Sequence, residues 1–176
     1  IDGTTQPGFA GVPLIELNGT SAPVTTDGLL LTASDCVIRG LVLNRWKGDG
    51  LEIQGGANNV VEGCYLGVSL TGTADQGNSL NGVFVNGSAN NRFGTPDQGN
   101  VISGNEDNGV LVLGAASAGN RIQGNRIGQN ANGGAALGNT DHGIWIQGAP
   151  GTQIGGTANG EGNFISGNRQ HGLFLS

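Results

Sequence analysis

A short unit that begins with glycine and continues with alternating apolar residues recurs along the whole chain. The runs GVFVN and GVLVL are examples, and the glycines that begin the units are Gly28, Gly50, Gly82, Gly109, Gly143 and Gly172. Successive units start 22, 32, 27, 34 and 29 residues apart. Alternation over a few residues with many β-branched side chains is typical of β-strands. The chain is therefore expected to consist of stacked copies of one β unit.

The amino-acid composition excludes the other classes of protein that a glycine-rich chain can form. Of the 176 residues, 36 are glycine, methionine is absent and charged residues make up 11%. Too few straight-chain residues remain for a mainly helical protein. Collagen is excluded because the chain has only 5 prolines and lacks a strict three-residue glycine period. Disorder is excluded because 36% of the residues are hydrophobic and stand in regular runs.

Two kinds of insertion explain the unequal spacing of the units. One follows an LG or IG step, at residues 67–78 and 128–139, and the other precedes a GN step, at 94–99 and 155–162. Without insertions the unit has 22 residues, as in 28–49, and residues 50–108 align with 109–171 as a double repeat. We therefore divide the chain into a lead-in strand or partial cap over residues 1–27 and repeated coils over residues 28–176.

Each unit contains three short apolar runs separated by glycine and asparagine, for example GLLLT, CVIRG and LVLN. Three strands in a unit of nearly constant length describe one coil of a parallel β-helix. A β-sandwich is the alternative, but hairpin turns would not keep the same residue types at the same place in every unit. We expect an all-β, right-handed, single-stranded parallel β-helix of about six coils with three strands per coil. Its predicted core is Leu29, Leu31, Leu51, Ile53, Val83, Val85, Val110, Val112, Ile144 and Ile146.

These repeats resemble the parallel β-helix repeat family of large secreted and cell-surface proteins of bacteria. The stretches that carry the resemblance include IDGTTQPGFAGVPLIELNG, VIRGLVLN, NVISGN, NRIQGNRIG, AALGN, IGG and NFISGN, and they cover essentially the whole chain. The resemblance implies a non-catalytic region of an extracellular or cell-surface protein. It names no reaction, and a fold alone does not define a function.

Asparagine recurs at the turns, where a side-chain amide can satisfy buried backbone groups of its own coil and of the next one. We predict two such columns. The first contains Cys36, Asn59, Asn100, Asn120 and Asn163, and the second contains Leu41, Cys64, Asn105, Asn125 and Asn168. The two cysteines fall in different columns, so we expect free buried thiols rather than a disulfide or a metal pair.

The residue before each of the repeated glycines forms a third column, which contains Asp27, Asp49, Asn81, Asn108, His142 and His171. Aspartate and asparagine are ordinary turn residues before glycine, so most of this column needs no functional explanation. Both histidines of the chain fall in it on neighbouring coils, and Asp107 and Asp141 each come one position earlier. Asp107, Asp141, His142 and His171 are the weak candidates for a cluster that moves protons or holds a divalent metal. The alternative is that histidine simply tolerates a solvated turn.

An enzyme is the alternative function, and the sequence assigns it no catalytic residue. NTDHG at 139–143 and QHGL at 170–173 faintly resemble motifs of polygalacturonase-like hydrolases, which need paired carboxylates. The next coil lacks the aspartate pair, and Arg45, Lys47 and Asp49 are the nearest approach to a lyase site. The insertion at 71–78 contains one carboxylate and its counterpart contains none, so no calcium loop, metal ligand or cofactor is expected.

The middle residue of each repeated triplet should point outward, and these residues are unusually apolar. They are Leu30, Glu52, Phe84, Leu111, Trp145 and Phe174. We predict a binding surface made of Leu30, Phe84, Leu111, Trp145 and Phe174, because such a stripe usually marks a partner surface or a covering segment. Covering by the insertions or by a terminal segment is the alternative, and sugar stacking on Trp145 and Phe84 is a third interpretation.

Charge and chain ends limit the partners. The net charge of −6 gives no footprint for nucleic acid, and no apolar run is long enough for a membrane span. The last unit, 172–176, supplies a single strand, so we expect a fragment of a longer solenoid, or a homo-oligomer or end-to-end assembly.

The sequence favours a structural or adhesive extracellular module, with carbohydrate binding and self-assembly both left open. A polysaccharide or neighbouring domains or subunits would bind through the stripe and the open last coil. The alternative is a polysaccharide-processing enzyme of glycoside hydrolase or lyase type.

Overall fold

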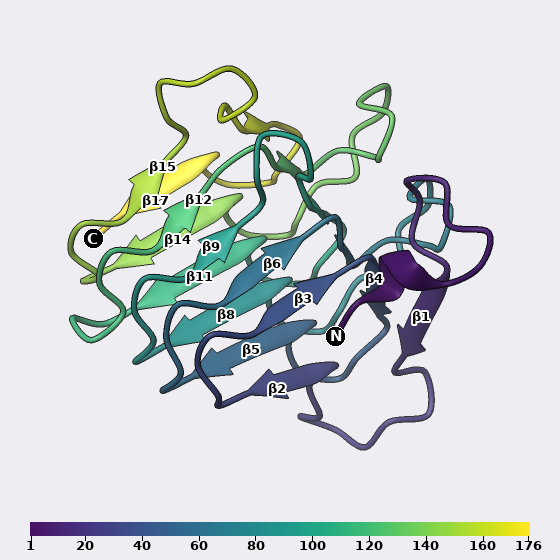
Figure 1. Cartoon of the computed structure of the whole chain (residues 1–176), viewed down its shortest axis with the longest axis horizontal. Helices are drawn as coiled ribbons and strands as arrows, with labels where there is room; N and C mark the ends of the chain where they lie inside the picture. The colour runs from purple at the N-terminus through teal and green to yellow at the C-terminus, as the bar shows by residue number, and fades with distance from the viewer.

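Strands from successive coils stack into three parallel sheets in the computed structural model, which describes residues 1–176 (Figure 1). Sheet A contains β3 (Val37–Arg39), β6 (Val60–Glu62), β9 (Arg92–Phe93), β12 (Arg121–Ile122) and β15 (Gln153–Ile154). Sheet B contains β1 (Ile15–Asn18), β4 (Leu41–Asn44), β7 (Tyr65–Leu66), β10 (Val101–Ile102), β13 (Arg126–Ile127) and β16 (Phe164–Ile165). Sheet C contains β2 (Leu29–Leu31), β5 (Leu51–Gln54), β8 (Val83–Asn86), β11 (Val110–Leu113), β14 (Ile144–Gln147) and β17 (Leu173–Leu175).

The chain visits sheets A, B and C in that order in every coil, and each strand pairs in parallel with its equivalent one coil later. This arrangement confirms the predicted parallel β-helix of about six coils with three strands per coil. At the N-terminus, η1 (Gly3–Thr5) follows a parallel bridge between Asp2 and Arg39, and β1 pairs with β4. Residues 1–18 therefore extend sheet A by one bridge beside β3 and sheet B by the strand β1.

The inward-facing side chains form one continuous apolar core. Of the predicted core, the eight residues from Leu51 to Ile146 are buried, and Leu29 and Leu31 pack half-buried against them. Sheets A and B add further residues, including Ile38, Phe93 and Ile122. The predicted core is confirmed because side chains alternate strictly between the two faces of a strand.

Four hydrogen-bonded ladders run along the solenoid at its turns, rather than the two columns predicted. Ladder 1 contains Cys36, Asn59, Asn91 and Asn120. Ladder 2 contains Cys64, Asn100, Asn125 and Asn163. Ladder 3 contains Trp46, Asn78, Asn105, Asn139 and Asn168. Ladder 4 contains Asp27, Asp49, Asn81, Asn108, His142 and His171.

The two asparagine columns predicted from the sequence were wrong because they mixed these ladders. Asn100 and Asn163 belong with Cys64, whereas Asn91 takes the place given to Asn100. Leu41 belongs to no ladder, since it lies in the apolar core. Both cysteines are free and head different ladders, as expected, but only Cys64 is fully buried.

The ladders also have a direction. In ladders 1 to 3 each rung donates to the side-chain oxygen of the next coil; for example, the Asn100 amide donates to Asn125 Oδ1 at 3.0 Å. The first rung therefore donates only through its backbone N–H, as Cys36 and Cys64 do. Ladder 4 runs the other way, and its first rung, Asp27, only accepts. This polarity explains why cysteine is tolerated at two first rungs and aspartate at another.

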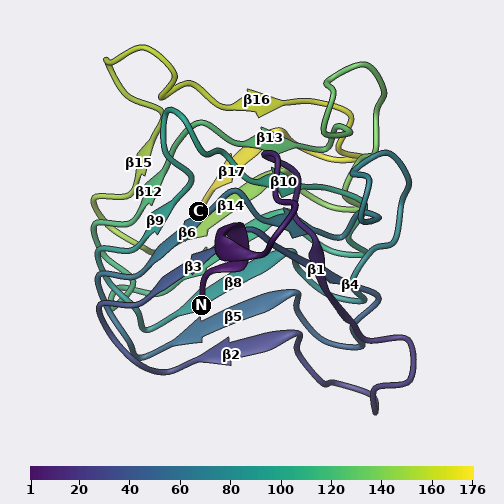
Figure 2. The ribbon, with the colours of Figure 1, turned by 45° about the vertical axis from the view of Figure 1, so that its right-hand side comes forward.

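The insertions at 67–78 and 128–139 fold over the outer face of sheet B. Each closes with an antiparallel bridge, and the Ala131 N–H donates to the Gly72 carbonyl at 2.9 Å, so the two insertions stack on each other. Beneath them Val42, Tyr65 and Val101 are buried in a second apolar cluster. Figure 2 shows both loops projecting beside β4, β10 and β13. No helical segment has the length and apolar character that crossing a bilayer requires.

Candidate functional site: the outer face of sheet C

The outer face of sheet C consists of three columns of side chains that run along the solenoid. The central column is the predicted apolar stripe, and its residues stand in register from strand to strand: Leu30, Glu52, Phe84, Leu111, Trp145 and Phe174. Ladder 4 flanks it on one side. On the other side lies a second outward column, Thr32, Gln54, Asn86, Leu113, Gln147 and Ser176. An apolar strip thus lies between two rows that are mostly polar.

The insertions do not cover this stripe, because they pack on sheet B. The N-terminal segment lies along sheets A and B instead. Leu30 is 52% exposed and the other stripe residues are half-buried by their neighbours in the column. The alternative interpretation, in which the insertions or the N-terminal segment cover the stripe, is therefore wrong.

Aromatic and imidazole rings gather at the C-terminal end of the face. The Trp145 and Phe174 ring centroids are 5.6 Å apart, and the His171 ring stacks on Phe174 at 5.4 Å. The His142 ring lies 4.8 Å from Phe174 and meets Trp145 edge-on at 5.7 Å. His142 is only 7% exposed, so it does not lie in a solvated turn. These rings form a partly exposed aromatic platform over the last two coils.

A hydrogen bond to His142 indicates the tautomer of its neutral ring. The His171 backbone N–H donates to His142 Nδ1 at 3.2 Å, so this nitrogen is an acceptor and a neutral ring carries its proton on Nε2. His142 Nε2 lies 3.5 Å from Asp141 Oδ1, within ion-pair distance, and this oxygen accepts no hydrogen bond. His142 Nδ1 and His171 Nδ1 are 3.4 Å apart. The sequence-predicted histidine cluster is thus assembled, with Asp141 beside it.

Asp107 lies one coil before Asp141 in the same row. The Asn108 amide donates to Asp107 Oδ1 at 3.0 Å, and the Asp141 N–H donates to the Asp107 carbonyl at 3.0 Å. Burial raises the pKa of Asp107, the Asp141 carboxylate raises it further, and His142 opposes both. The four candidates named from the sequence therefore occupy neighbouring positions at one end of the face.

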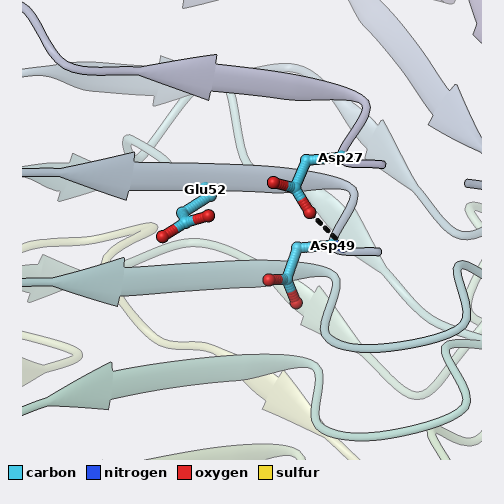
Figure 3. Close-up of side chains that lie close together, drawn as sticks. All are labelled: Asp27, Asp49 and Glu52. Carbon is cyan, nitrogen blue, oxygen red and sulfur yellow. Dashed lines mark hydrogen bonds between the residues drawn. The ribbon is translucent and has the colours of Figure 1, made fainter. Parts of the chain in front are cut away.

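Three carboxylates meet at the opposite, N-terminal end of the face (Figure 3). Asp27 and Asp49 come from ladder 4 and Glu52 from the stripe, and their ligand oxygens all lie within 4.8 Å of one another. Asp27 Oδ1 accepts from the Asp49 N–H at 2.8 Å. Carboxylate oxygens are ligands that calcium prefers, so these are the residues of the chain that could hold a divalent cation.

Crowding changes the acidity of this group. Burial raises the pKa of Asp49 to about 6; hydrogen bonds from Asn81 lower it, and the Asp27 and Asp107 charges raise it further. Burial also raises the pKa of Glu52, with the Asp27 and Asp49 carboxylates adding to the effect. A proton on Asp49 therefore compensates part of the negative charge below about pH 6.

Sequence reasoning placed Asp27 and Asp49 in one column and Glu52 in another, but it did not bring the three together. The spacing indicated that the two columns run close together, because Glu52 follows Asp49 by three residues and both columns repeat with every coil. What was missing was the direction of the turn side chains. Ladder 4 points toward the outer face, and its side chains therefore meet those of the stripe.

Three parallel sheets around one core define a β-solenoid, and one of its sides carries an uncovered apolar stripe. Residues 18–176 match the family described as "Right handed beta helix region", and the chain belongs to this family. Among solved structures, the A-module of the mannuronan C-5 epimerase AlgE4 from Azotobacter vinelandii is similar, with 18% identity and a TM-score of 0.37. The match covers 85% of this chain and 52% of that one, so this chain spans about half of the module. A search of curated proteins gives no significant match.

Proposed function

We propose that this chain is a non-catalytic carbohydrate-binding module that holds a polysaccharide along the outer face of sheet C. The observation that carries the proposal is the uncovered stripe, in which Phe84, Leu111, Trp145 and Phe174 stand in register between two polar columns. A sugar ring has an apolar face of C–H groups and an edge of hydroxyls, so it matches an aromatic surface bordered by accessible amides such as Gln54, Asn86 and Gln147.

The spacing of the face favours a polymer. Equivalent side chains recur once per coil, about 4.8 Å apart, along the axis of the solenoid. A linear polysaccharide lying across the strands would meet similar groups in every coil, so many weak contacts would add up. Such a ligand also agrees with the extracellular or cell-surface location expected from the sequence.

The test is binding to a panel of soluble polysaccharides, measured by isothermal titration and by tryptophan fluorescence, to which both Trp46 and Trp145 contribute. We expect Trp145→Ala to weaken binding of the best ligand about tenfold or more, in a variant whose circular dichroism spectrum matches that of the wild type. Phe164→Ala is the control, because Phe164 is an aromatic residue on an outer face, 60% exposed, but lies on sheet B. Equal losses in the two variants, or no saturable binding by the wild-type chain, would contradict the proposal.

Self-association through the same stripe is the competing occupant of this face. Sedimentation velocity over a concentration series separates the two. A dimer that Trp145→Ala dissociates would assign the stripe to a second copy of the chain. A monomer that binds polysaccharide would assign it to the glycan.

One observation favours the alternative function, a polysaccharide-processing enzyme. His142 and Asp141 lie together at the edge of the aromatic platform, with His142 Nε2 3.5 Å from Asp141 Oδ1, and an imidazole beside a carboxylate is a pair of groups that acid–base catalysis uses. The test is to incubate the chain with each bound polysaccharide and to look for new reducing ends or unsaturated sugars. Products that disappear in His142→Asn would establish catalysis. A bound polysaccharide that stays intact would leave the binding module as the function.

A further inference from the structure

The outer face of sheet A carries a pair of arginines that face each other across neighbouring strands. Arg92 in β9 and Arg121 in β12 are direct partners in the parallel register, and both side chains are exposed. Val60 precedes them in the same column and Gln153 follows. Like charges placed directly opposite each other destabilise a sheet, so this pairing needs a reason.

Neither arginine has an acidic partner in the chain. The ion pairs of the structure involve Arg39, which lies 2.7 Å from Asp2 and 3.7 Å from Glu62, and the pair of His142 with Asp141. The chain has seven basic residues and a net charge of −6, so acidic partners are plentiful elsewhere. Arg92 and Arg121 nevertheless lie on neighbouring strands without an acidic partner.

The arginines also line a groove. With Asn58, Asn90 and the backbone of Gly119 they enclose a space of about 280 Å³. The asparagines hold left-handed turns, with φ of 59° and 58°. Gly119 has a φ of 69°, and a Cβ there would lie 2.5 Å from Asn90 Oδ1, so only glycine leaves room for that amide. The groove is thus shaped by turns that do not depend on the arginines.

We propose that this groove binds a single oxyanion, a sulfate or carboxylate group of the kind carried by acidic polysaccharides. The planar guanidinium group presents paired N–H donors that match both anions, and an anion between Arg92 and Arg121 would relieve their repulsion. Because the net charge is −6, the chain does not attract polyanions over its whole surface, and a local contact with one acidic group is favoured. The proposal does not rest on the carbohydrate site of sheet C, which lies on another face.

The experiment compares dextran sulfate, polygalacturonate and sodium sulfate with unmodified dextran, by isothermal titration and by melting temperature. We expect the charged ligands, but not dextran, to bind and to raise the melting temperature of the wild-type chain. Arg92→Gln and Arg121→Gln should each weaken binding about tenfold or more. Arg126→Gln is the matched control, since this arginine lies on sheet B, 5.0 Å from the Phe164 ring.

The outcomes are distinct. Binding of a polymer but not of sodium sulfate assigns the anion to a saccharide, whereas equal binding of the salt assigns the groove to a free oxyanion, and either result supports the site. Equal losses in Arg126→Gln and Arg121→Gln would show unspecific attraction and overturn it. An unchanged melting temperature with every anion would do the same. Trp145→Ala should leave this binding intact, so failure here and failure of the sheet C proposal can be told apart.

Discussion

The outer faces of sheets B and C both carry apolar columns, but only the column on sheet B is covered by the chain itself. Val42, Tyr65 and Val101 lie under the insertions and are at most 9% exposed. Phe84 and Leu111, at equivalent positions on sheet C, remain half-buried with no segment of the chain packed on them. The two apolar columns thus differ in their surroundings: the column on sheet B extends the core, and the column on sheet C is the surface that we propose for a polysaccharide.

Close approach makes the cover on sheet B possible. Gly72 in the first insertion has a φ of 69°, and a Cβ there would lie 2.8 Å from Cε2 of Tyr65 and 2.5 Å from Cβ of Ala131. The insertions can therefore lie directly on the Tyr65 ring and on each other. Sheet C is entered through glycines that follow ladder 4, and no insertion intervenes there. The position of an insertion in the coil decides which face is closed.

The largest difference should appear when a charge is placed in each column. Val101→Glu would bury a carboxylate beneath the insertions, and we expect it to lower the free energy of unfolding by more than about 3 kcal/mol. Leu111→Glu places a carboxylate in a column of sheet C that already contains one, Glu52. It should lower the free energy of unfolding by no more than about 1 kcal/mol. Urea denaturation of both variants measures the two values. Similar losses would mean that the stripe is as buried as the sheet B column.

The acidic end of sheet C should respond to pH in a way that the covered face does not. Asp49 has a pKa raised to about 6, from 3.8, so between these values the folded chain binds more protons than the unfolded chain. Its contribution to stability therefore falls as the pH rises from about 4 to about 6. Asp49→Asn keeps the acceptor for Asn81 without the charge, and should be about 2 kcal/mol more stable than wild type at pH 7 and equal to it at pH 3.

Urea midpoints at the two pH values test this expectation. Asp97→Asn, in the exposed insertion at 94–99, is the matched control and should change stability little at either pH. An equal gain from Asp49→Asn at both pH values would contradict charge repulsion as the cause. A rise in melting temperature on adding calcium to the wild type at pH 7, absent in Asp49→Asn, would show that a cation compensates the negative charge of the three carboxylates.

The smallest effect concerns the single tyrosine of the chain, which reports on the cover of sheet B. Burial raises the pKa of Tyr65 above its usual value of 10. Ultraviolet titration of the folded protein should therefore show phenol ionisation at higher pH than in the urea-unfolded protein. Replacing residues 129–136 by a short turn should move the titration back toward the unfolded value. Identical curves for the folded and unfolded protein would mean that the insertions do not shield the ring.

The sequence predicts the repeating parts of this molecule well and the irregular parts poorly. Alternation after each glycine fixes which side chains are inward, so the core and the stripe follow from residues such as Val85 and Trp145. The ladders were harder, because Asn91 and Asn100 flank one insertion and both precede short strands. The cover of sheet B was not predicted, since it depends on the path of the insertions. The meeting of Asp27, Asp49 and Glu52 depends on the direction of a turn, which spacing does not reveal.

The direction of the ladders has a consequence for how such a solenoid can be lengthened by duplication. An interior rung of ladder 2 must donate to one neighbour and accept from the other, as Asn125 does through both ends of its amide. The repeat 109–171 carries Asn125 and Asn163 at its two ladder 2 rungs, so a tandem copy of it would keep this ladder unbroken. The repeat 50–108 carries Cys64, whose thiol is a weak acceptor, at the first of them. For ladder 2, the second repeat can therefore be copied in tandem without a break, whereas a copy of the first would interrupt the ladder at Cys64.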